Sequence, residues 1–290
     1  MGLIARIKEY FARRKRLPVL GLSLGSGGAK GMAHLGALKA FEEEGITFSV
    51  ITGASIGSIV GALYAKGYSS KDMIGIIEGL NRKEFSKNLH PLADLGFAEA
   101  FLEQYLEGDI EGLPKPFAAW VTDAKTNEGL AIRTGKIARV LTASAAIPPF
   151  FRGVEIDGKK YYDGAFSNAV PAEVCREMNA DVVIGVDLAA FIKTEEEKSF
   201  FVRMVGSALN YVMPVKYTAD CRTRGYAAAD VMLRPNLRDF SSTDISRSAM
   251  DAMYEIGYRE AREHMPEIKQ AIEEATRRVR KQKKTQRPEP

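Results

Sequence analysis

A short apolar run, a glycine-rich turn and a helical segment follow one another twice near the start of this 290-residue chain. Residues 17–24 (LPVLGLSL) lead into a glycine cluster at residues 25–31 (GSGGAKG), and apolar residues then recur at helical spacing. Residues 48–52 (FSVIT) lead into the turn G-A-S-I-G at residues 53–57, which a helix of small residues follows. Strand, turn and helix in this order build layered sheets, so the pattern predicts an α/β fold.

The rest of the chain continues the alternation. The run VVIGVDL at residues 182–188 is almost entirely apolar, which is typical of a strand covered on both faces. Asp157-Gly158 lies between two short β-rich runs and predicts a hairpin. We expect one α/β domain over residues 18–270. Further strands are expected at residues 118–123, 129–133, 154–156, 160–162 and 230–234, and helices at 32–44, 56–66, 136–145 and 246–272, the last broken at Pro266.

Composition excludes several classes of protein. With 46% hydrophobic and 27% charged residues the chain is globular rather than disordered or fibrous. Its two cysteines are too few for a disulfide framework, which fits a reducing compartment. Its three histidines are scattered and show no metal-site spacing. We therefore expect neither a metal ion nor a cofactor.

Positive charge is concentrated at the two ends of the chain. Residues 1–20 contain six Lys or Arg and one Glu, and residues 271–290 contain seven and three, whereas the whole chain has a net charge of +4. The body is therefore acidic, which argues against a nucleic-acid groove and for an anionic partner at the ends. Membrane phospholipid is one such partner.

The ends themselves predict two terminal segments. Leu3, Ile7 and Phe11 share one helical face in residues 1–17, and basic residues occupy the rest, so a basic amphipathic helix is expected. This helix either lies on a membrane surface or is a solvated or core-docked terminal helix. Residues 271–290 are expected to be a disordered basic tail. No apolar run of spanning length and no signal peptide is present, so we expect a cytoplasmic protein with a peripheral membrane contact.

Ser55, at the centre of the G-A-S-I-G turn, is the strongest candidate for chemistry. A sharp turn between strand and helix lifts a serine hydroxyl clear of the sheet, and glycines on both sides allow the backbone to pass closely. The following helix N-terminus favours developing negative charge. The plain alternative is a glycine-rich tight turn without a chemical role.

The glycine cluster at residues 25–31 offers backbone N–H groups for an oxyanion. The rival interpretation is a nucleotide-phosphate loop. A P-loop needs Ser or Thr after its lysine, but Gly31 follows Lys30, and the dinucleotide motif starting at Gly25 would need glycine at position 30. Both nucleotide motifs therefore fail, and a purely structural turn remains as the other alternative.

A nucleophilic serine needs a base, and a histidine is the usual one. Ser55, Asp163 and His264 occur in the chain order of an α/β-hydrolase triad. His264, however, lies in a charged helical end rather than in a loop after a strand, so we reject this triad. His34 is expected to be packed or capping, and His90 to lie in a loop. A carboxylate is then the remaining candidate for the base. Asp163 is followed by Gly164 and is either that base or a simple turn residue.

Three ordered motifs resemble the patatin-like phospholipase family. They are S-G-G-A-K-G at residues 26–31, G-A-S-I-G at residues 53–57 and D-G-A at residues 163–165. The segments 142–148, 168–171, 180–188 and 234–244 are also similar to the family, so the resemblance covers roughly residues 18–265. One departure is Ser26, where most members have glycine.

The resemblance implies a three-layer α/β fold with a central, mostly parallel sheet flanked by helices. It also implies a Ser–Asp dyad without histidine that hydrolyses acyl esters of phospholipid or lysophospholipid. By position Ser55 is then the nucleophile, Asp163 the base, and the N–H groups of Gly27 and Gly28 the oxyanion hole. A thioesterase, a general carboxylesterase and a non-catalytic scaffold with this fold remain alternatives. Because no histidine serves as the base, no rate inflection is expected near pH 6.5. A carboxylate near its reference pKa of about 3.9 is a weak base for serine.

Two apolar stretches of the sequence bear on how a lipid substrate would bind. Residues 85–101 and 200–213 are rich in Phe and Leu and either line an acyl pocket, face lipid or form plain core.

Overall fold

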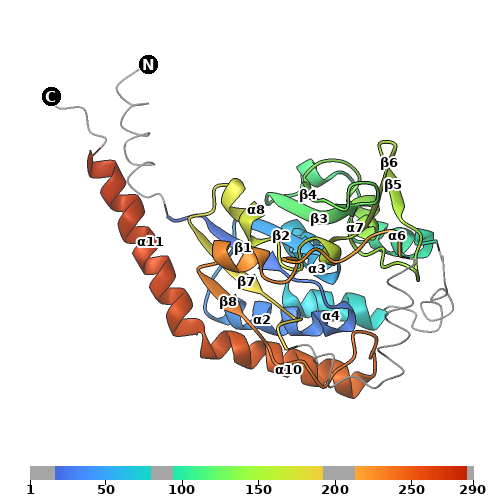
Figure 1. Cartoon of the computed structure of the whole chain (residues 1–290). Helices are drawn as coiled ribbons and strands as arrows, with labels where there is room; N and C mark the ends of the chain where they lie inside the picture. The colour runs from blue at the N-terminus through green and yellow to red at the C-terminus, as the bar shows by residue number, and fades with distance from the viewer. Residues whose placement is uncertain (1–16, 80–93, 192–212, 286–290) are drawn as a thin grey trace.

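The computed structural model describes residues 17–79, 94–191 and 213–285 and builds them around one sheet (Figure 1). Its strands are β1 (Leu20–Leu24), β2 (Val50–Ala54), β3 (Phe117–Asp123), β4 (Gly129–Ile132), β5 (Val154–Ile156), β6 (Lys159–Asp163), β7 (Val182–Val186) and β8 (Val231–Leu233). Its α-helices are α2 (Met32–Glu43), α3 (Ile56–Lys66), α4 (Ser70–Gly79), α6 (Gly96–Glu103), α7 (Ile137–Ser144), α8 (Ala172–Glu177), α10 (Arg247–Glu263) and α11 (Met265–Thr285).

The strand order is β5-β6-β3-β2-β1-β7-β8, with β4 paired to β3 beside this path. The five strands from β3 to β8 run parallel, whereas β4, β5 and β6 pair antiparallel. The chain passes from β1 to β2 on one side and returns to β7 on the other. In such sheets the crevice beyond the carboxyl ends of the strands, at the point where the order reverses, is the usual place for a ligand. The ladders set Leu24 opposite Gly53 and Val186, so both glycine turns leave the sheet at this point.

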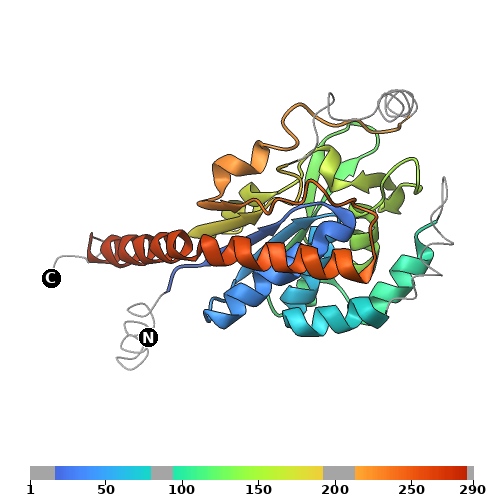
Figure 2. The ribbon, with the colours of Figure 1, turned by 90° about the horizontal axis from the view of Figure 1, so that it is seen from below.

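Helices cover both faces of the sheet, which makes three layers (Figure 2). On one face Leu22, Leu24 and Ile51 belong to the main core, together with side chains of α2, α3, α4 and α10. On the other face Val50 and Val183 pack with Cys175 of α8. The alternation of neighbouring residues 50 and 51 between the two cores follows from the two-residue period of a strand. The expected three-layer α/β fold with a mostly parallel sheet is confirmed.

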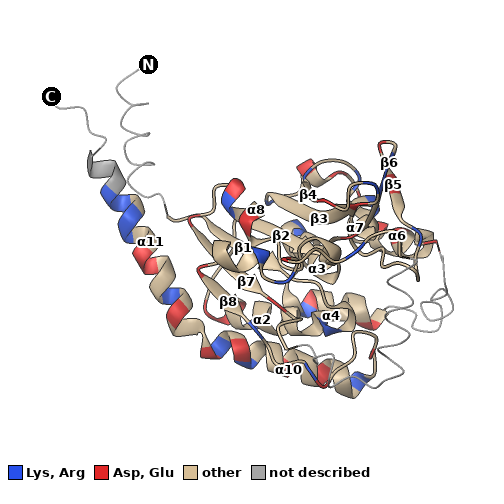
Figure 3. Cartoon of the chain, viewed as in Figure 1, with Lys and Arg blue, Asp and Glu red and all other residues tan. Residues whose placement is uncertain are grey.

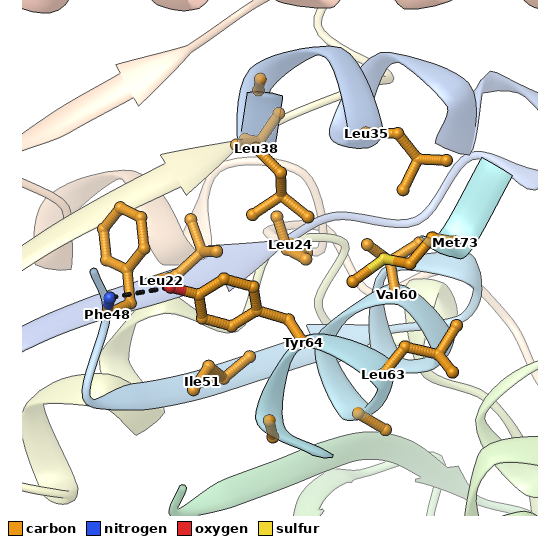
Figure 4. Packing of buried hydrophobic residues seen from close by; sticks show 14 of the residues in the cluster. Leu22, Leu24, Leu35, Leu38, Phe48, Ile51, Val60, Leu63, Tyr64 and Met73 are labelled. Atoms are coloured by element: carbon orange, nitrogen blue, oxygen red, sulfur yellow. Dashed lines mark hydrogen bonds between the residues drawn. The ribbon is translucent and has the colours of Figure 1, made fainter. Parts of the chain in front are cut away.

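The main core packs around strands β1 and β2 (Figure 4). The Tyr64 hydroxyl accepts a hydrogen bond of 3.0 Å from the backbone N–H of Phe48, so α3 holds the loop that precedes β2. The rings of Phe41 and Phe48 meet edge to face with centroids 5.1 Å apart, a geometry that aromatic pairs favour. These contacts fix the start of β2 and thereby the place where its carboxyl end turns.

The structure differs from the sequence-based expectation at the C-terminal end. The disordered tail expected at residues 271–290 is wrong for residues 271–285, because α11 continues to Thr285. Apolar residues recur at spacings of three and four in this helix, and Ile268, Ala275 and Val279 are buried. The ion pair between Glu273 and Arg277, one turn apart, adds support. The expected break near Pro266 falls where α10 ends and α11 begins.

Other expectations lie partly or wholly outside the described residues. The amphipathic helix expected at residues 1–17 belongs to this group, as does most of the apolar stretch at residues 200–213. Helix α8, which the sequence analysis did not anticipate, is only six residues long. None of the described helices has both the length and the apolar character that a membrane span requires.

Candidate active site

Ser55 occupies a strained turn between β2 and α3. Its backbone angles are φ 54° and ψ −127°, and α3 begins at the next residue. A non-glycine residue at such angles costs about 1–3 kcal/mol, so neighbouring contacts must hold it in place. A Cβ atom on Gly57 would meet the backbone of Leu24 at the end of β1, and one on Gly53 would meet the backbone of Gly57. The two glycines of the motif therefore have a steric cause, as expected from the sequence.

Asp163 ends β6 and lies against the Ser55 hydroxyl. Ser55 Oγ donates a hydrogen bond of 2.6 Å to Asp163 Oδ2, and the N–H of Ala165 donates one of 2.8 Å to Oδ1. The aspartate is 1% exposed and the serine 5% exposed. The structure thus brings together the two residues that the sequence analysis singled out as nucleophile and base.

Burial sets the protonation behaviour of this pair. Removal from water raises the pKa of Asp163 to about 6, while the hydrogen bonds from Ser55 and Ala165 oppose this rise. The sequence analysis assumed a carboxylate near its reference pKa of about 3.9, and this assumption is wrong for the folded chain. A carboxylate with a higher pKa is a stronger base, and at pH 7 it is still mostly ionised.

The glycine cluster passes over the carboxyl ends of β1 and β7. Backbone hydrogen bonds hold it in place: the N–H of Gly25 donates to Val186 (2.9 Å) and that of Ser26 to Ala169 (3.0 Å). Ala29 N–H donates to the carbonyl of Ser242 at 2.7 Å. The loop is therefore anchored on both sides of Gly27 and Gly28.

The N–H groups of Gly27 and Gly28 donate no hydrogen bond within the described part of the chain. Gly28 has a positive φ of 58°, which glycine accepts without strain. Positive φ values occur among the described non-glycine residues at Ser55, Asn127, Asp157 and Asn179. Ser26 is not one of them, so serine is compatible with the backbone at this position.

The two histidines within the described residues, His34 and His264, take no part in the Ser55–Asp163 pair. His34 is fully buried, its Nε2 lies 2.8 Å from the carbonyl of Gly25, and burial lowers its pKa to about 4. It is therefore a neutral residue packed beneath the glycine cluster. His264 ends α10, where its Nδ1 lies 3.0 Å from the carbonyl of Glu260. His90 lies outside the described residues.

Metal-binding clusters and reactive thiols are the other groups that could carry chemistry. Within residues 17–79, 94–191 and 213–285, no cluster of three or more His, Cys, Asp or Glu side chains is arranged to hold a metal ion. Cys175 and Cys221 are free and buried, and desolvation raises the pKa of the Cys175 thiol to about 12. A thiol of this pKa does not ionise at neutral pH.

The described part of the apolar stripe expected near the site packs into the core. Leu95 and Phe97 belong to a second hydrophobic cluster, which also contains Tyr162 and Phe166 from either side of Asp163. Leu95 of the expected acyl-pocket stripe is therefore core, and Phe97 is partly buried and packs against that core. Residues 85–92 and 200–212 lie outside the described part of the chain.

Sequence reasoning missed the polar residues beneath the pair. Ser144 accepts a hydrogen bond of 2.9 Å from the N–H of Ser55, and Thr122 donates one of 2.9 Å to the carbonyl of Asp163. Ser144 lies in the segment 142–148 that contributes to the family resemblance, which is the one signal that pointed toward it. Nothing in the sequence around Thr122 distinguishes it from an ordinary strand residue.

Fold and site together define an α/β protein in which a serine on a sharp strand-to-helix turn contacts a buried carboxylate. The sequence model of the patatin-like phospholipase family matches residues 22–176, more than half of the chain. The chain therefore belongs to the patatin-like phospholipase family.

Two relatives illustrate the range of the family. The chain is 26% identical over 280 residues to patatin-like phospholipase domain-containing protein 6 of Mus musculus, which covers 83% of this chain and 20% of that protein. It is 32% identical over 178 residues to an uncharacterised NTE family protein of Mycobacterium bovis, with 59% of this chain and 49% of that protein covered. The chain thus spans about a fifth of the first relative and about half of the second.

Solved structures share the fold at low sequence identity. VipD from Legionella pneumophila has a TM-score of 0.56 and 16% identity, over 90% of this chain and 67% of VipD. Human GIVD cytosolic phospholipase A2 has a TM-score of 0.54 and 10% identity, over 95% of this chain and 65% of that protein. The likeness concerns the arrangement of sheet and helices.

The raised pKa of Asp163 predicts that this residue lowers stability at neutral pH. The folded pKa of about 6 exceeds the unfolded value of about 4, so between these values the folded state holds a proton that the unfolded state has lost. Stability therefore falls as pH rises through this window. Asp163→Asn removes the buried charge and should raise the free energy of unfolding at pH 8 by up to roughly 3 kcal/mol, with no gain near pH 4.

Urea unfolding of both proteins between pH 4 and 8 measures this difference. Asp239→Asn, a change of an exposed aspartate, is the matched control and should leave the pH profile unchanged. An Asp163→Asn variant no more stable than wild type at pH 8 would show that the buried carboxylate carries no such cost.

Proposed function

We propose that this chain is a serine hydrolase that cleaves acyl ester bonds of lipids, phospholipid or lysophospholipid, through Ser55 and Asp163. The observation that carries the proposal is the buried 2.6 Å hydrogen bond from Ser55 Oγ to Asp163 Oδ2. It pairs a hydroxyl with a group able to take its proton, directly after the carboxyl end of β2. Membership of the patatin-like phospholipase family supports the same chemistry.

The first half of the reaction forms an acyl-enzyme. Ser55 Oγ attacks the acyl carbonyl carbon while its proton moves to Asp163 Oδ2. The negative charge that develops on the carbonyl oxygen is stabilised by the N–H groups of Gly27 and Gly28, which are unused within the described residues. The bond to the leaving alcohol then breaks, and Asp163 returns the proton to the leaving oxygen.

The second half releases the fatty acid. Asp163, ionised again, takes a proton from a water molecule as that water attacks the acyl carbon. The bond between the acyl carbon and Ser55 Oγ breaks, and the proton returns to the serine. A base with a pKa of about 6 suits both directions of transfer better than an exposed carboxylate does.

Apolar side chains exposed near Asp163 support a lipid as substrate. Phe150 is 49% exposed and Ile147 38% exposed, and Ile147 follows Ala146, whose carbonyl accepts the N–H of Asp163. Tyr217 is 56% exposed, and its ring stacks on Phe166 at 4.5 Å. Large apolar side chains that remain exposed around a polar site fit acyl chains better than small soluble esters.

Removal of either proposed catalytic group tests the mechanism. Ser55→Ala and Asp163→Asn should each reduce kcat/KM on lipid esters by about 10³-fold or more, because one lacks the nucleophile and the other the base. His264→Ala, which removes the histidine of the rejected triad, should keep kcat/KM within about twofold of the wild-type value. The rates are measured on a panel of phospholipid, lysophospholipid, thioester and short-chain esters.

The panel separates the alternatives. Faster turnover of thioesters or short soluble esters than of lipids would replace the proposed substrate by that of a thioesterase or carboxylesterase. A well-folded wild type that hydrolyses nothing, and that a fluorophosphonate does not label at Ser55, would point to a scaffold. A large loss in His264→Ala would overturn the Ser–Asp dyad.

The pH profile should reflect the ionisation of Asp163. Because its pKa is about 6, kcat/KM should fall as pH drops below this value, with one ionisation. This replaces the expectation of no inflection near pH 6.5, which followed from the absence of a histidine base. Carboxyl ionisation has a small enthalpy, so the inflection should move little between 10 and 40 °C and should persist in His264→Ala. An inflection that shifts strongly with temperature would indicate a histidine instead.

We also propose that α11 contacts an anionic membrane surface. Figures 1 and 2 show that this helix extends beyond the sheet, and Figure 3 shows basic residues gathered toward its C-terminal end. Arg277, Arg278, Arg280 and Lys281 are exposed. Each Lys or Arg near an anionic lipid surface contributes about 1 kcal/mol of attraction.

Neutralisation of two of these arginines tests the contact. Arg278→Gln with Arg280→Gln should weaken binding to vesicles containing phosphatidylglycerol by roughly 30-fold, the equivalent of about 2 kcal/mol. Lys71→Gln with Lys125→Gln removes the same charge from exposed positions on the body and serves as the control. Binding is measured by vesicle sedimentation. Equal binding to phosphatidylcholine vesicles, or equal weakening by both double variants, would contradict the proposal.

A further inference from the structure

Two buried chains of hydrogen bonds run from strand β3 to the backbones of Ser55 and Asp163. In the first chain the N–H of Ser55 donates to Ser144 Oγ at 2.9 Å, and Ser144 Oγ donates to the carbonyl of Trp120 at 2.7 Å. Ser144 is fully buried and ends α7. Its hydroxyl accepts one hydrogen bond and donates one, so the strained turn is tied directly to β3.

The second chain reaches the aspartate. Thr122 Oγ1 donates to the carbonyl of Asp163 at 2.9 Å and also lies 2.8 Å from Ser167 Oγ. Since the single proton of Thr122 is used on Asp163, Ser167 is the donor in the second contact; the other acceptor near its hydroxyl, the carbonyl of Gly164, is farther away at 3.4 Å. Ser167 Oγ in turn accepts the indole N–H of Trp120 at 3.0 Å. The donation therefore runs in one direction, from Trp120 through Ser167 and Thr122 to Asp163.

Both chains include Trp120 of β3, the second also includes Thr122, and both consist of buried groups. Trp120 and Thr122 lie on one strand, and the side chains of Thr122, Ser144 and Ser167 are almost completely buried. Each hydroxyl has a donor and an acceptor partner, which is the condition under which a buried polar network is rigid. Loss of one member leaves a buried polar group unpaired, at a cost of about 1–3 kcal/mol.

We propose that Ser144, Thr122 and Ser167 are positioning residues that set the distance between Ser55 Oγ and Asp163 Oδ2. This inference rests on the proposed function, in which proton transfer between these atoms is required. Ser55 is held at a φ of 54°, which it would not keep without its neighbours. A displacement of about 1 Å at a reacting group can cost 10²-fold in rate. The hydroxyl network therefore affects the rate of reaction without touching the substrate.

Substitutions that keep shape and remove a hydroxyl test the proposal. Thr122→Val and Ser144→Ala should each slow fluorophosphonate labelling of Ser55, and kcat on a lipid ester, by roughly 10- to 100-fold while KM stays within about twofold. Thr122→Ser restores the hydroxyl and should return the labelling rate to near that of wild type. Thermal unfolding is recorded for each variant, and rates are compared at a temperature at which all are folded.

Matched controls separate positioning from general destabilisation. Thr142→Val changes a buried threonine whose Oγ1 donates only to the carbonyl of Arg139 in its own helix. Ser23→Ala changes a buried serine of β1 that has no hydrogen-bond partner within the described part of the chain. Both controls should label at the rate of wild type, even where their unfolding temperatures fall.

Trp120 provides an independent signal because it is the only tryptophan in the chain. Its indole N–H is part of the second chain, so Ser167→Ala and Thr122→Val should shift its fluorescence emission, and the two control variants should not. Emission that is unchanged in all four variants would show that the network is not formed as described.

The labelling experiments separate a failure of the positioning role from a failure of the proposed function. Labelling rates of Thr122→Val and Ser144→Ala within twofold of the rate of Thr142→Val would overturn the positioning role. Labelling of the wild-type protein would in that case still support the proposed hydrolase. Failure of wild type itself to be labelled or to cleave any ester would overturn the proposed function, and the positioning role with it. If Thr122→Val does not fold, the labelling rate of Ser144→Ala is compared with that of Ser23→Ala, and equal rates would overturn the positioning role.

Discussion

The hydrogen bond between Ser55 and Asp163 joins residues that are 108 positions apart, and strand β3 is what makes it possible. On one side of β3, Trp120 is paired with Ala54, the residue before Ser55. On the other side Val121 is paired with Asp163 itself. Two neighbouring residues of one central strand thus set the register of both partners. A one-residue slip of either pairing would separate them, because it would turn side chains to the opposite face.

Much of this arrangement could be predicted because its causes are local. The runs that became β1, β2, β3 and β7 are apolar or β-rich, and glycines mark the turns where backbones pass closely. Gly53 and Gly57 face each other across the Ser55 turn, so the motif has a steric reason that the sequence displays. The pairing of Ser55 with Asp163 was reached by rejecting His264 and by the resemblance to a family, since no local pattern reports a contact across the sheet.

The remaining features could not be predicted because they arise from tertiary packing. The pKa of Asp163 depends on burial, and the roles of Ser144, Thr122 and Ser167 depend on which carbonyl and N–H groups the fold places beside them. The part of α11 from residue 271 to residue 285 was expected to be disordered because it is basic and lies at the end of the chain. A strained serine and a buried carboxylate also oppose the rules that the rest of the chain follows. Such exceptions are expected where a fold spends stability on a functional site.

In the proposed mechanism Ser55 becomes acylated during turnover, with Asp163 as its base. Acid quenching of the protein during hydrolysis of an ester substrate, followed by peptide mass spectrometry, tests this directly. We expect an acyl adduct on the peptide that contains Ser55, and no such adduct in Asp163→Asn. Turnover without any adduct under conditions in which deacylation is slow, or an adduct on a different residue, would contradict it.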